Sequence, residues 1–238
     1  MNRDKSDTEK TAKTFDEYGL SYAESVTKAV EFTGLSLDFV TRVKGDYIVG
    51  LARHHAGDAS KLSALDVGCG IGNFHPLLVP AFRSVSGVDI SGVSIDVARA
   101  NNPDVDYKVY DGQVLPYDTD SFDVAFTVCV MHHVPPSLWP NFVREMQRVL
   151  KPGGQALVFE HNPLNPLTMR IVNSCPFDED AVLLRQGQTK KLFEQASFKD
   201  VYSRTILTVP PKGGVLRGLD RALGVLPLGA QYYVSATK

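Results

Sequence analysis

The sequence predicts an α/β protein in which a mostly parallel sheet is covered by helices on both faces. From Ala64 to His161, short apolar runs alternate with stretches whose apolar residues recur at helical spacing. Parallel strands need a crossover connection, and helices supply it on either face of the sheet. The first apolar run also ends in three glycines within five positions, Gly68, Gly70 and Gly72. A glycine-rich turn from strand to helix is typical of the ligand-binding edge of such sheets.

The elements follow one another in a regular order. Five strands are expected, at ALDVG, VSGVDI, VDYKVYD, FDVAFTVCV and QALVFEH, and helices between them at FHPLLVPAFRS, VSIDVARANN and SLWPNFVREMQRVL. Pro80 should break the first of these helices, and KPGG should form the turn before the fifth strand. Helices are also expected ahead of the first strand and in TKKLFEQASF.

Domain organisation is expected to be simple. Residues 1–14 carry no large apolar side chain after Met1, which predicts a disordered tail. Residues 15–238 are expected to form one domain, divided into a helical cap (15–60), a cofactor-binding core (61–160), a lid-like insertion (161–188) and a C-terminal helix with strands (189–238). The insertion is longer than an ordinary α/β connection and mixes apolar residues with polar ones, which suits a lid over a small molecule.

Composition narrows the class of protein. The chain has 238 residues with 25 basic and 27 acidic ones, so no global field favours nucleic acid or an anionic membrane. A secretion signal and an apolar run of membrane-spanning length are both missing, and we therefore expect a cytoplasmic protein without a membrane span. Cys69, Cys129 and Cys175 are odd in number and far apart, which predicts reduced thiols and no metal site.

Acidic residues follow three of the predicted strands. Asp66 precedes the glycine turn, Asp89 ends the second strand, and Asp111 ends the third, ahead of Gly112 and Gln113. A carboxylate at the second position can accept from both hydroxyls of a ribose, and one at the third can accept from an adenine amine. A single such Asp more often caps a helix or forms a turn. Three such acidic residues at one edge of the sheet favour a nucleoside-containing ligand.

From about Ala64 to Glu160 the chain resembles the class I S-adenosylmethionine-dependent methyltransferases, near the branch that includes ubiquinone and menaquinone biosynthesis enzymes. LDVGCGIGNF, VSGVDIS, DGQVLPYDTDSFDVAFTVCVMHHV and EMQRVLKPGG occur in that family's order. The resemblance implies a Rossmann-like sheet of seven strands with the last antiparallel, for which LPLGAQYYVSATK is suitable. It also implies S-adenosylmethionine as cofactor and methyl transfer as the reaction. This cofactor has no phosphate, which agrees with a glycine turn lacking Lys and Arg.

The resemblance further implies which residues surround each part of the cofactor. Those flanking the methionine moiety would be Asp66, Gly68, Cys69 and Gly70. Those around the ribose and adenine would be Asp89, Ile90, Asp111, Gly112 and Gln113. Those beside the methyl-bearing end would be Thr127 and Val128.

Catalytic residues are harder to predict, because an activated methyl group needs little beyond a nucleophile held in line with it. The candidates for a base are His133 and His161, which follow the fourth and fifth strands; the alternative for each is an ordinary packed or capping histidine. The candidates for substrate contact are Tyr18, Tyr22, His132 and Arg170. We expect the acceptor to be a small molecule, methylated at oxygen, nitrogen or carbon, because a basic, aromatic-rich surface for nucleic acid is missing.

Two other functions are compatible with parts of the pattern. A nicotinamide-dependent oxidoreductase is disfavoured by G-x-G-x-G in place of G-x-G-x-x-G, and by the acid after the third strand. The sequence also allows a scaffold protein that binds S-adenosylmethionine without catalysis, because a protein can keep its fold after losing its catalytic activity.

Overall fold

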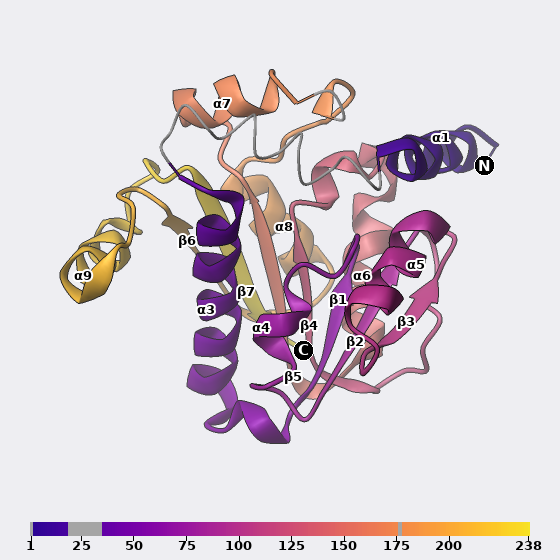
Figure 1. Ribbon diagram of the computed structural model, residues 1–238, viewed down its shortest axis with the longest axis horizontal. Coiled ribbons are helices and arrows are strands. Elements are labelled where there is room, and N and C mark those ends of the chain that lie inside the picture. Colours follow the sequence, from indigo (N-terminus) through magenta and orange to yellow (C-terminus); the bar gives the residue numbers. More distant parts are fainter. Residues whose placement is uncertain (1, 19–34, 176–177) are drawn as a thin grey trace.

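A computed structural model describes residues 2–18, 35–175 and 178–238 (Figure 1). Seven strands of the described residues form one sheet in the order β3-β2-β1-β4-β5-β7-β6. Their bounds are β1 Ser63–Val67, β2 Ser84–Asp89, β3 Asp106–Val109, β4 Phe122–Val128, β5 Leu150–His161, β6 Lys199–Ile206 and β7 Gln231–Thr237. The strands β1 to β5 pair in parallel, whereas β7 runs antiparallel to both of its neighbours, β5 and β6. The predicted Rossmann-like sheet with an antiparallel last strand is thus confirmed.

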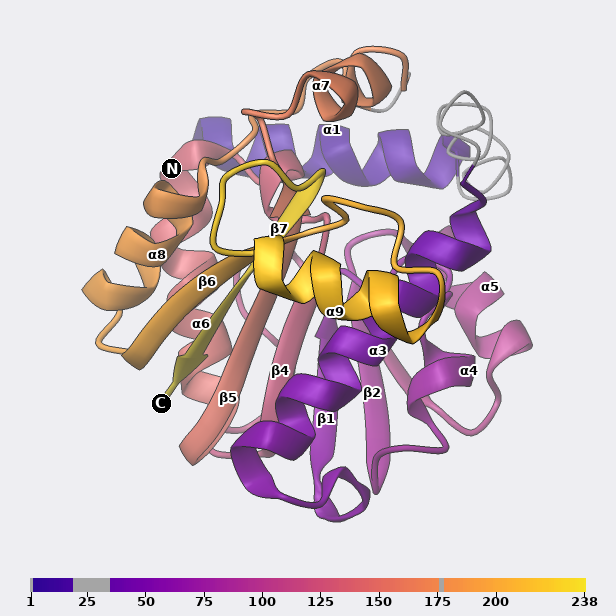
Figure 2. The same cartoon turned by 90° about the vertical axis from the view of Figure 1, so that its left-hand side faces the viewer.

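Helices cover both faces of this sheet (Figure 2). Their bounds are α1 Asn2–Tyr18, α3 Leu37–Ala56, α4 His75–Leu78, α5 Gly92–Asn101, α6 Trp139–Val149, α7 Pro166–Val172, α8 Gln186–Gln195 and α9 Gly213–Leu223. Because successive strand residues point to opposite faces, Ala64 packs with Ile48 of α3, whereas Leu65 packs with Met146 of α6. Two apolar cores result, one under α3, α4 and α5 and one under α6 and α8.

Local sequence explains where several elements begin and end. The Ser36 side chain caps α3 by accepting from the N–H of Phe39 at 3.1 Å. The helix predicted in FHPLLVPAFRS shortens to α4, which ends before Pro80. KPGG is part of β5, which begins at Leu150, and is not a turn between α6 and that strand as predicted. An irregularity in the pairing of β4 with β5 accommodates this stretch, where Gly153 has φ +77°.

The N-terminal segment differs from the expected disordered tail, since α1 is a helix that lies along the sheet edge where the cofactor motifs end. Tertiary contacts hold it in place. Asp16 accepts from the Ser91 hydroxyl at 2.6 Å and from the Val93 N–H at 3.3 Å, at the N-terminus of α5. Lys10 pairs with Asp180 at 2.6 Å. Lys10 of the predicted tail and Asp16 just beyond it thus connect α1 to the rest of the fold.

Within the described residues, no helix is long and apolar enough to cross a membrane.

Candidate active site

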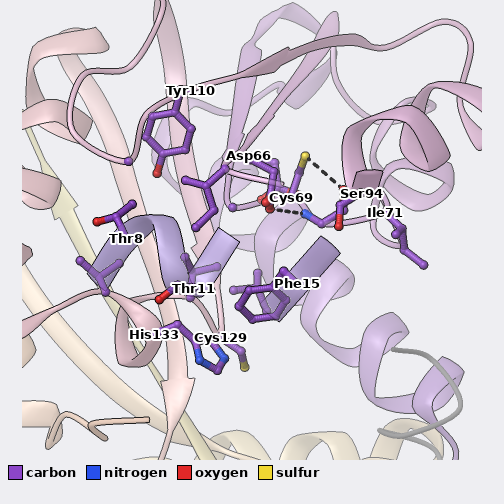
Figure 3. Close-up of a pocket in the computed structure, with 18 of the residues that line it drawn as sticks. Thr8, Thr11, Phe15, Asp66, Cys69, Ile71, Ser94, Tyr110, Cys129 and His133 are labelled. Atoms are coloured by element: carbon purple, nitrogen blue, oxygen red, sulfur yellow. Dashed lines mark hydrogen bonds between the residues drawn. The ribbon is translucent and has the colours of Figure 1, made fainter. Parts of the chain in front are cut away.

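A cavity opens beyond the carboxyl ends of the central strands (Figure 3). It comprises about 1100 Å³ of space between atoms, including open solvent at its mouth. The turn after β1 and the end of β2 form one wall, the end of β4 forms another, and Thr8, Thr11 and Phe15 of α1 cover the opening.

Two of the glycines in the turn after β1 are required by close contacts. Gly68 has φ +77°, and a Cβ there would lie 2.5 Å from the Val130 side chain across the cavity wall. Gly72 has φ +76°, and its Cβ would lie 2.5 Å from the Tyr107 hydroxyl. The turn is held on β2, because the N–H groups of Gly68 and Cys69 donate to the Val88 carbonyl at 2.8 and 3.0 Å. Gly68 thus brings main chain to the cavity wall, whereas Gly72 makes room for the Tyr107 hydroxyl behind it.

Asp89 is a buried carboxylate that lines the cavity. Its two oxygens accept from the N–H groups of Gly70 at 2.8 Å and Ser91 at 2.9 Å. Each oxygen keeps capacity for another hydrogen bond, so a vicinal pair of hydroxyls can still bind. Burial disfavours the charged form and raises the pKa of Asp89 to about 6, against the hydrogen bonds from Ser91 and Gly70.

Asp66 ends a buried polar relay. His75 Nε2 lies 3.2 Å from the Asp66 carboxylate, and His75 Nδ1 is hydrogen-bonded to the Tyr107 hydroxyl. All three groups find partners if Nε2–H donates to Asp66 and the Tyr107 hydroxyl donates to Nδ1. Burial raises the pKa of Asp66, and the contact with His75 opposes this rise. These hydrogen bonds hold the Asp66 carboxylate at the cavity, where it would stabilise a cationic amino group.

A second buried network lies at the ends of β4 and β5. Glu160 Oε1 accepts from the N–H groups of Val130 and Met131 at 3.1 and 2.8 Å, and Oε2 lies 2.5 Å from His132 Nδ1. Burial favours the neutral ring, but Glu160 and Asp178 overcome it and raise the pKa of His132 to about 10. His132 is therefore an imidazolium at neutral pH, paired with a buried carboxylate.

His133 faces the cavity beside this network. Its Nε2 lies 3.3 Å from Asp178 Oδ1, and its ring meets Phe15 of α1 edge to face, with 4.9 Å between centroids. Burial and the neighbouring positive charge of His132 lower the pKa of His133 to about 3. A neutral imidazole can accept a hydrogen bond, and a carboxylate beside it can stabilise the positive charge that forms when it takes a proton.

Cys129 lines the cavity next to these histidines, with φ +58°. Lys44 Nζ lies 3.8 Å and Gln231 Nε2 3.6 Å from its sulfur. Although burial opposes ionisation of the thiol, Lys44 and His161 lower the pKa of Cys129 to about 7. His161 is not among the described residues that line the cavity; its Nδ1 lies 3.4 Å from Gln231 Nε2, and its ring centroid lies 5.1 Å from that of His132 with the planes tilted by 52°.

Most of the residues predicted to bind the cofactor do line the cavity, namely Asp66, Gly68, Cys69, Gly70, Asp89, Ile90, Gly112 and Val128. Asp111, Gln113 and Thr127 do not. Asp111 is exposed and accepts from the N–H groups of Gln113 and Val114 at 2.9 and 3.0 Å, which makes it a turn former. Thr127 is fully buried in β4, where strand alternation points it to the face opposite Val128.

The candidates for substrate contact fare differently from one another. His132 is buried behind the cavity wall, and Arg170 lies exposed on α7, so neither lines the cavity. Tyr22 and the side chain of Tyr18 lie outside the described residues. Sequence reasoning missed Thr8, Thr11 and Tyr110 as lining residues, and Asp178 as the partner of the histidines. A partial signal existed for Phe15, which belongs to the aromatic segment FDEYGLSYAES.

The sequence indicated no metal site, but within the described residues one group has ligand spacing. One nitrogen each of His132 and His133 and one oxygen of Asp178 lie within 4.8 Å of one another. The contacts of these groups describe an ion-pair network: His132 Nδ1 lies 2.5 Å from Glu160, and Asp178 Oδ1 lies 3.6 Å from His132 Nε2 and 3.3 Å from His133 Nε2. We therefore interpret the group as a positioned acid–base pair, His133 with Asp178, beside a structural ion pair.

The cavity fits S-adenosylmethionine. Asp89 can accept from ribose hydroxyls, and Asp66 offers a carboxylate to the methionine amino group. The described residues that line the cavity include neither Lys nor Arg, as suits a cofactor without phosphate. At Gly70, which also lines the cavity, a Cβ would meet nothing within 4 Å, so the main chain there is open to a ligand.

Comparison with known proteins agrees with this geometry. Residues 65–158 match a family model described as a methyltransferase domain. The chain is 28% identical over 215 residues to squalene methyltransferase 2 of Botryococcus braunii, covering 81% of this chain and 56% of that protein. It is 35% identical over 133 residues to 27-O-demethylrifamycin SV methyltransferase of Amycolatopsis mediterranei, covering 50% and 44%. The chain thus spans about half the length of these curated relatives.

Solved structures share the fold. A SAM-dependent methyltransferase from Archaeoglobus fulgidus superposes with a TM-score of 0.62 at 17% identity, covering 82% of this chain and 94% of that one. A phosphoethanolamine N-methyltransferase 2 from Haemonchus contortus, in complex with S-adenosyl-L-methionine, superposes with a TM-score of 0.58 at 19% identity, covering 80% and 51%. The ubiquinone and menaquinone branch stays a prediction. Residues 65–158 match the methyltransferase model, and the motif order, the sheet topology and these structural neighbours support a class I S-adenosylmethionine-dependent methyltransferase.

Proposed function

We propose that the chain methylates a hydroxyl group of a small, largely apolar molecule, with His133 as the acceptor of the hydroxyl proton. The observation that carries this proposal is the His133 imidazole, which lines the same cavity as Asp89 and the glycine turn and has Asp178 at 3.3 Å. The bound cofactor supplies an activated methyl group. The protein has to hold the acceptor in line, keep water out and take up one proton.

His133 can orient the acceptor by accepting a hydrogen bond from its hydroxyl. The acidity of that hydroxyl rises as its oxygen bonds to the methyl group, so a weak base suffices to take the proton. The carboxylate of Asp178 stabilises the imidazolium that forms. Phe15 packs on the His133 ring and limits its rotation. Asp89 and Asp66 fix the cofactor by its hydroxyls and its amino group.

The small-molecule class is supported by the covering of the cavity and by relatives. α1 overlies the opening with Thr8, Thr11 and Phe15, which leaves no broad groove there for a folded nucleic acid among the described residues. Two relatives are named for squalene and for a demethylrifamycin, both small molecules with large apolar surfaces. A third, from Saccharomyces cerevisiae, is named as a tRNA methyltransferase and is 35% identical over 101 residues, so tRNA belongs in the test.

The test begins with binding. Titration with S-adenosylmethionine, S-adenosylhomocysteine and NADH should give binding of the first two alone; NADH binding would favour an oxidoreductase. Labelled methyl transfer is then screened against lipophilic alcohols and phenols, unsaturated hydrocarbons, amines and bulk tRNA. Transfer to tRNA or to hydrocarbons in preference to hydroxyl compounds would overturn the proposal. Binding without transfer to any acceptor class would favour the non-catalytic scaffold.

The role of His133 is tested with a matched pair of variants. His133→Asn should lower kcat by about a hundredfold, the usual contribution of a general base, while leaving S-adenosylhomocysteine affinity nearly unchanged. His54→Asn changes an exposed histidine of α3 and serves as the control. Unchanged turnover in His133→Asn would refute the assignment of the proton acceptor.

A further inference from the structure

The helix α9 turns its apolar side away from the protein. Asp220 is the one residue of α9 that is buried, and it accepts from the N–H groups of Thr208 at 2.7 Å and Val209 at 3.2 Å. Val215 and Leu219 are one helical turn apart on the outer side, and Val215 is 87% exposed. The helix is therefore attached to the body by its polar side, the reverse of an ordinary surface helix.

The exposed apolar surface continues beyond the helix. The turn after α9 reads VLPL, and three of its side chains are exposed large hydrophobics: Val225, Leu226 and Leu228. Asn165, which caps α7, donates to the Leu228 carbonyl at 2.7 Å. Exposed Leu164 and Leu167 flank that asparagine. We call this set the α9 surface: Leu164, Leu167, Val215, Leu216, Leu219, Val225, Leu226 and Leu228. Figure 2 shows α9 in front of α3 and α7 above it, at the top of the molecule.

The exposed charged residues of α9 itself are basic. Lys212 precedes α9, and Arg217 and Arg221 are the exposed charged residues of the helix, since its acid, Asp220, is buried. Arg217 pairs with Asp46 at 3.4 Å, but both side chains are at least half exposed, and such a pair is readily exchanged for another anion. An apolar helix face and loop tip bordered by cations is the pattern of segments that lie in a bilayer interface.

We propose that the α9 surface binds the face of a membrane containing anionic phospholipid. Its leucines and valines would enter the boundary between headgroups and acyl chains, while Lys212, Arg217 and Arg221 contact the phosphates. A second copy of the chain fits less well, because a twofold contact would bring the same cations of both copies together. The surface is hydrogen-bonded to the start of α7 near the active site, so membrane contact would place the lid-like segment beside the lipid phase.

This inference is independent of the proposed function, because membrane binding is measured without methyl transfer. The full chain is sedimented with vesicles of phosphatidylcholine alone or with about one-third phosphatidylglycerol. We expect strong partitioning to the anionic vesicles, weakened at high ionic strength. Absent binding, or equal binding to both vesicle types, would overturn the proposal.

Two substitutions test the residues. Val215→Asp lies in the first turn of α9, where a carboxylate favours the helix, so the fold should persist while partitioning falls about tenfold or more. Val114→Asp is the control, since Val114 is 60% exposed in the loop before β4, at the other edge of the sheet. Lys212→Gln combined with Arg217→Gln should remove most of the salt dependence. Unchanged partitioning of Val215→Asp would refute the proposal, and a shift from dimer to monomer in that variant would assign the surface to a second copy.

Discussion

Cofactor binding should depend on pH through Asp89. Because the carboxylate is buried, its pKa lies at about 6, well above that of an ordinary aspartate. A group with this pKa is about nine-tenths ionised at pH 7 and about one-tenth ionised at pH 5. If only the ionised form accepts from both ribose hydroxyls, the affinity for S-adenosylhomocysteine should fall about tenfold between these pH values.

The matched variant is Asp89→Asn. Its amide cannot accept from both hydroxyls, so affinity at pH 7 should fall by about 1.5 to 3 kcal/mol, or roughly ten- to a hundredfold. Its affinity should then be nearly independent of pH between 5 and 7. Calorimetry of both proteins at matched ionic strength measures how the affinity of each for S-adenosylhomocysteine changes with pH. Parallel pH profiles would refute the reasoning, because they would place the titrating group elsewhere in the cavity.

The same shift has a consequence for folding. A raised pKa means that the folded protein holds this proton more tightly than the unfolded chain. The stabilisation from Asp89 is therefore fully present below the ordinary aspartate pKa and is lost as the pH rises through about 6. Thermal scans of the protein without cofactor, compared with Asp89→Asn, should show this difference between pH 4 and pH 7.

Four further outcomes are expected. Gly68→Ala should lower cofactor affinity at least tenfold by calorimetry, because its Cβ would lie 2.5 Å from Val130; unchanged affinity would mean that the turn has room. His75→Phe should weaken S-adenosylmethionine binding more than adenosine binding, since it releases the carboxylate facing the amino group; equal losses would assign His75 a purely structural role. Asp16→Ala should increase proteolysis within α1 through loss of its contacts to α5, and intact resistance would contradict that anchoring. Methyl transfer should survive EDTA, whereas loss restored by a divalent metal would show that His132, His133 and Asp178 bind an ion.

The order of motifs along the chain was enough to predict the sheet and to select residues most of which line one cavity. Alternating strands and helices admit few topologies, and the ends of parallel strands meet at one edge of the sheet. Asp66, Gly68 and Asp89 could therefore be assigned to one site although they are distant in sequence. Positive φ at Gly68 likewise follows from a turn that only glycine adopts without strain.

Side-chain direction and long-range packing were decided by the tertiary structure. Thr127 and Val128 are adjacent in the sequence, but only one of them lines the cavity, because the register of β4 points them to opposite faces. Asp111 forms a turn through one oxygen, Oδ1, which accepts from the N–H groups of Gln113 and Val114, and its contact with adenine stays a prediction.

The N-terminal helix and the acid–base pair show the same division between local and long-range information. Composition predicted a disordered tail, but anchors supplied by α5 and by Asp180 lie far along the chain and leave no local pattern. Asp178 contacts His133 although the two are 45 residues apart in the sequence, and the sequence pattern between them does not predict this contact. The local sequence pattern determined which acidic and glycine residues stand at the sheet edge. Contacts between segments distant in sequence decided which residues cover the cavity there, because these contacts depend on packing that exists only in the folded chain.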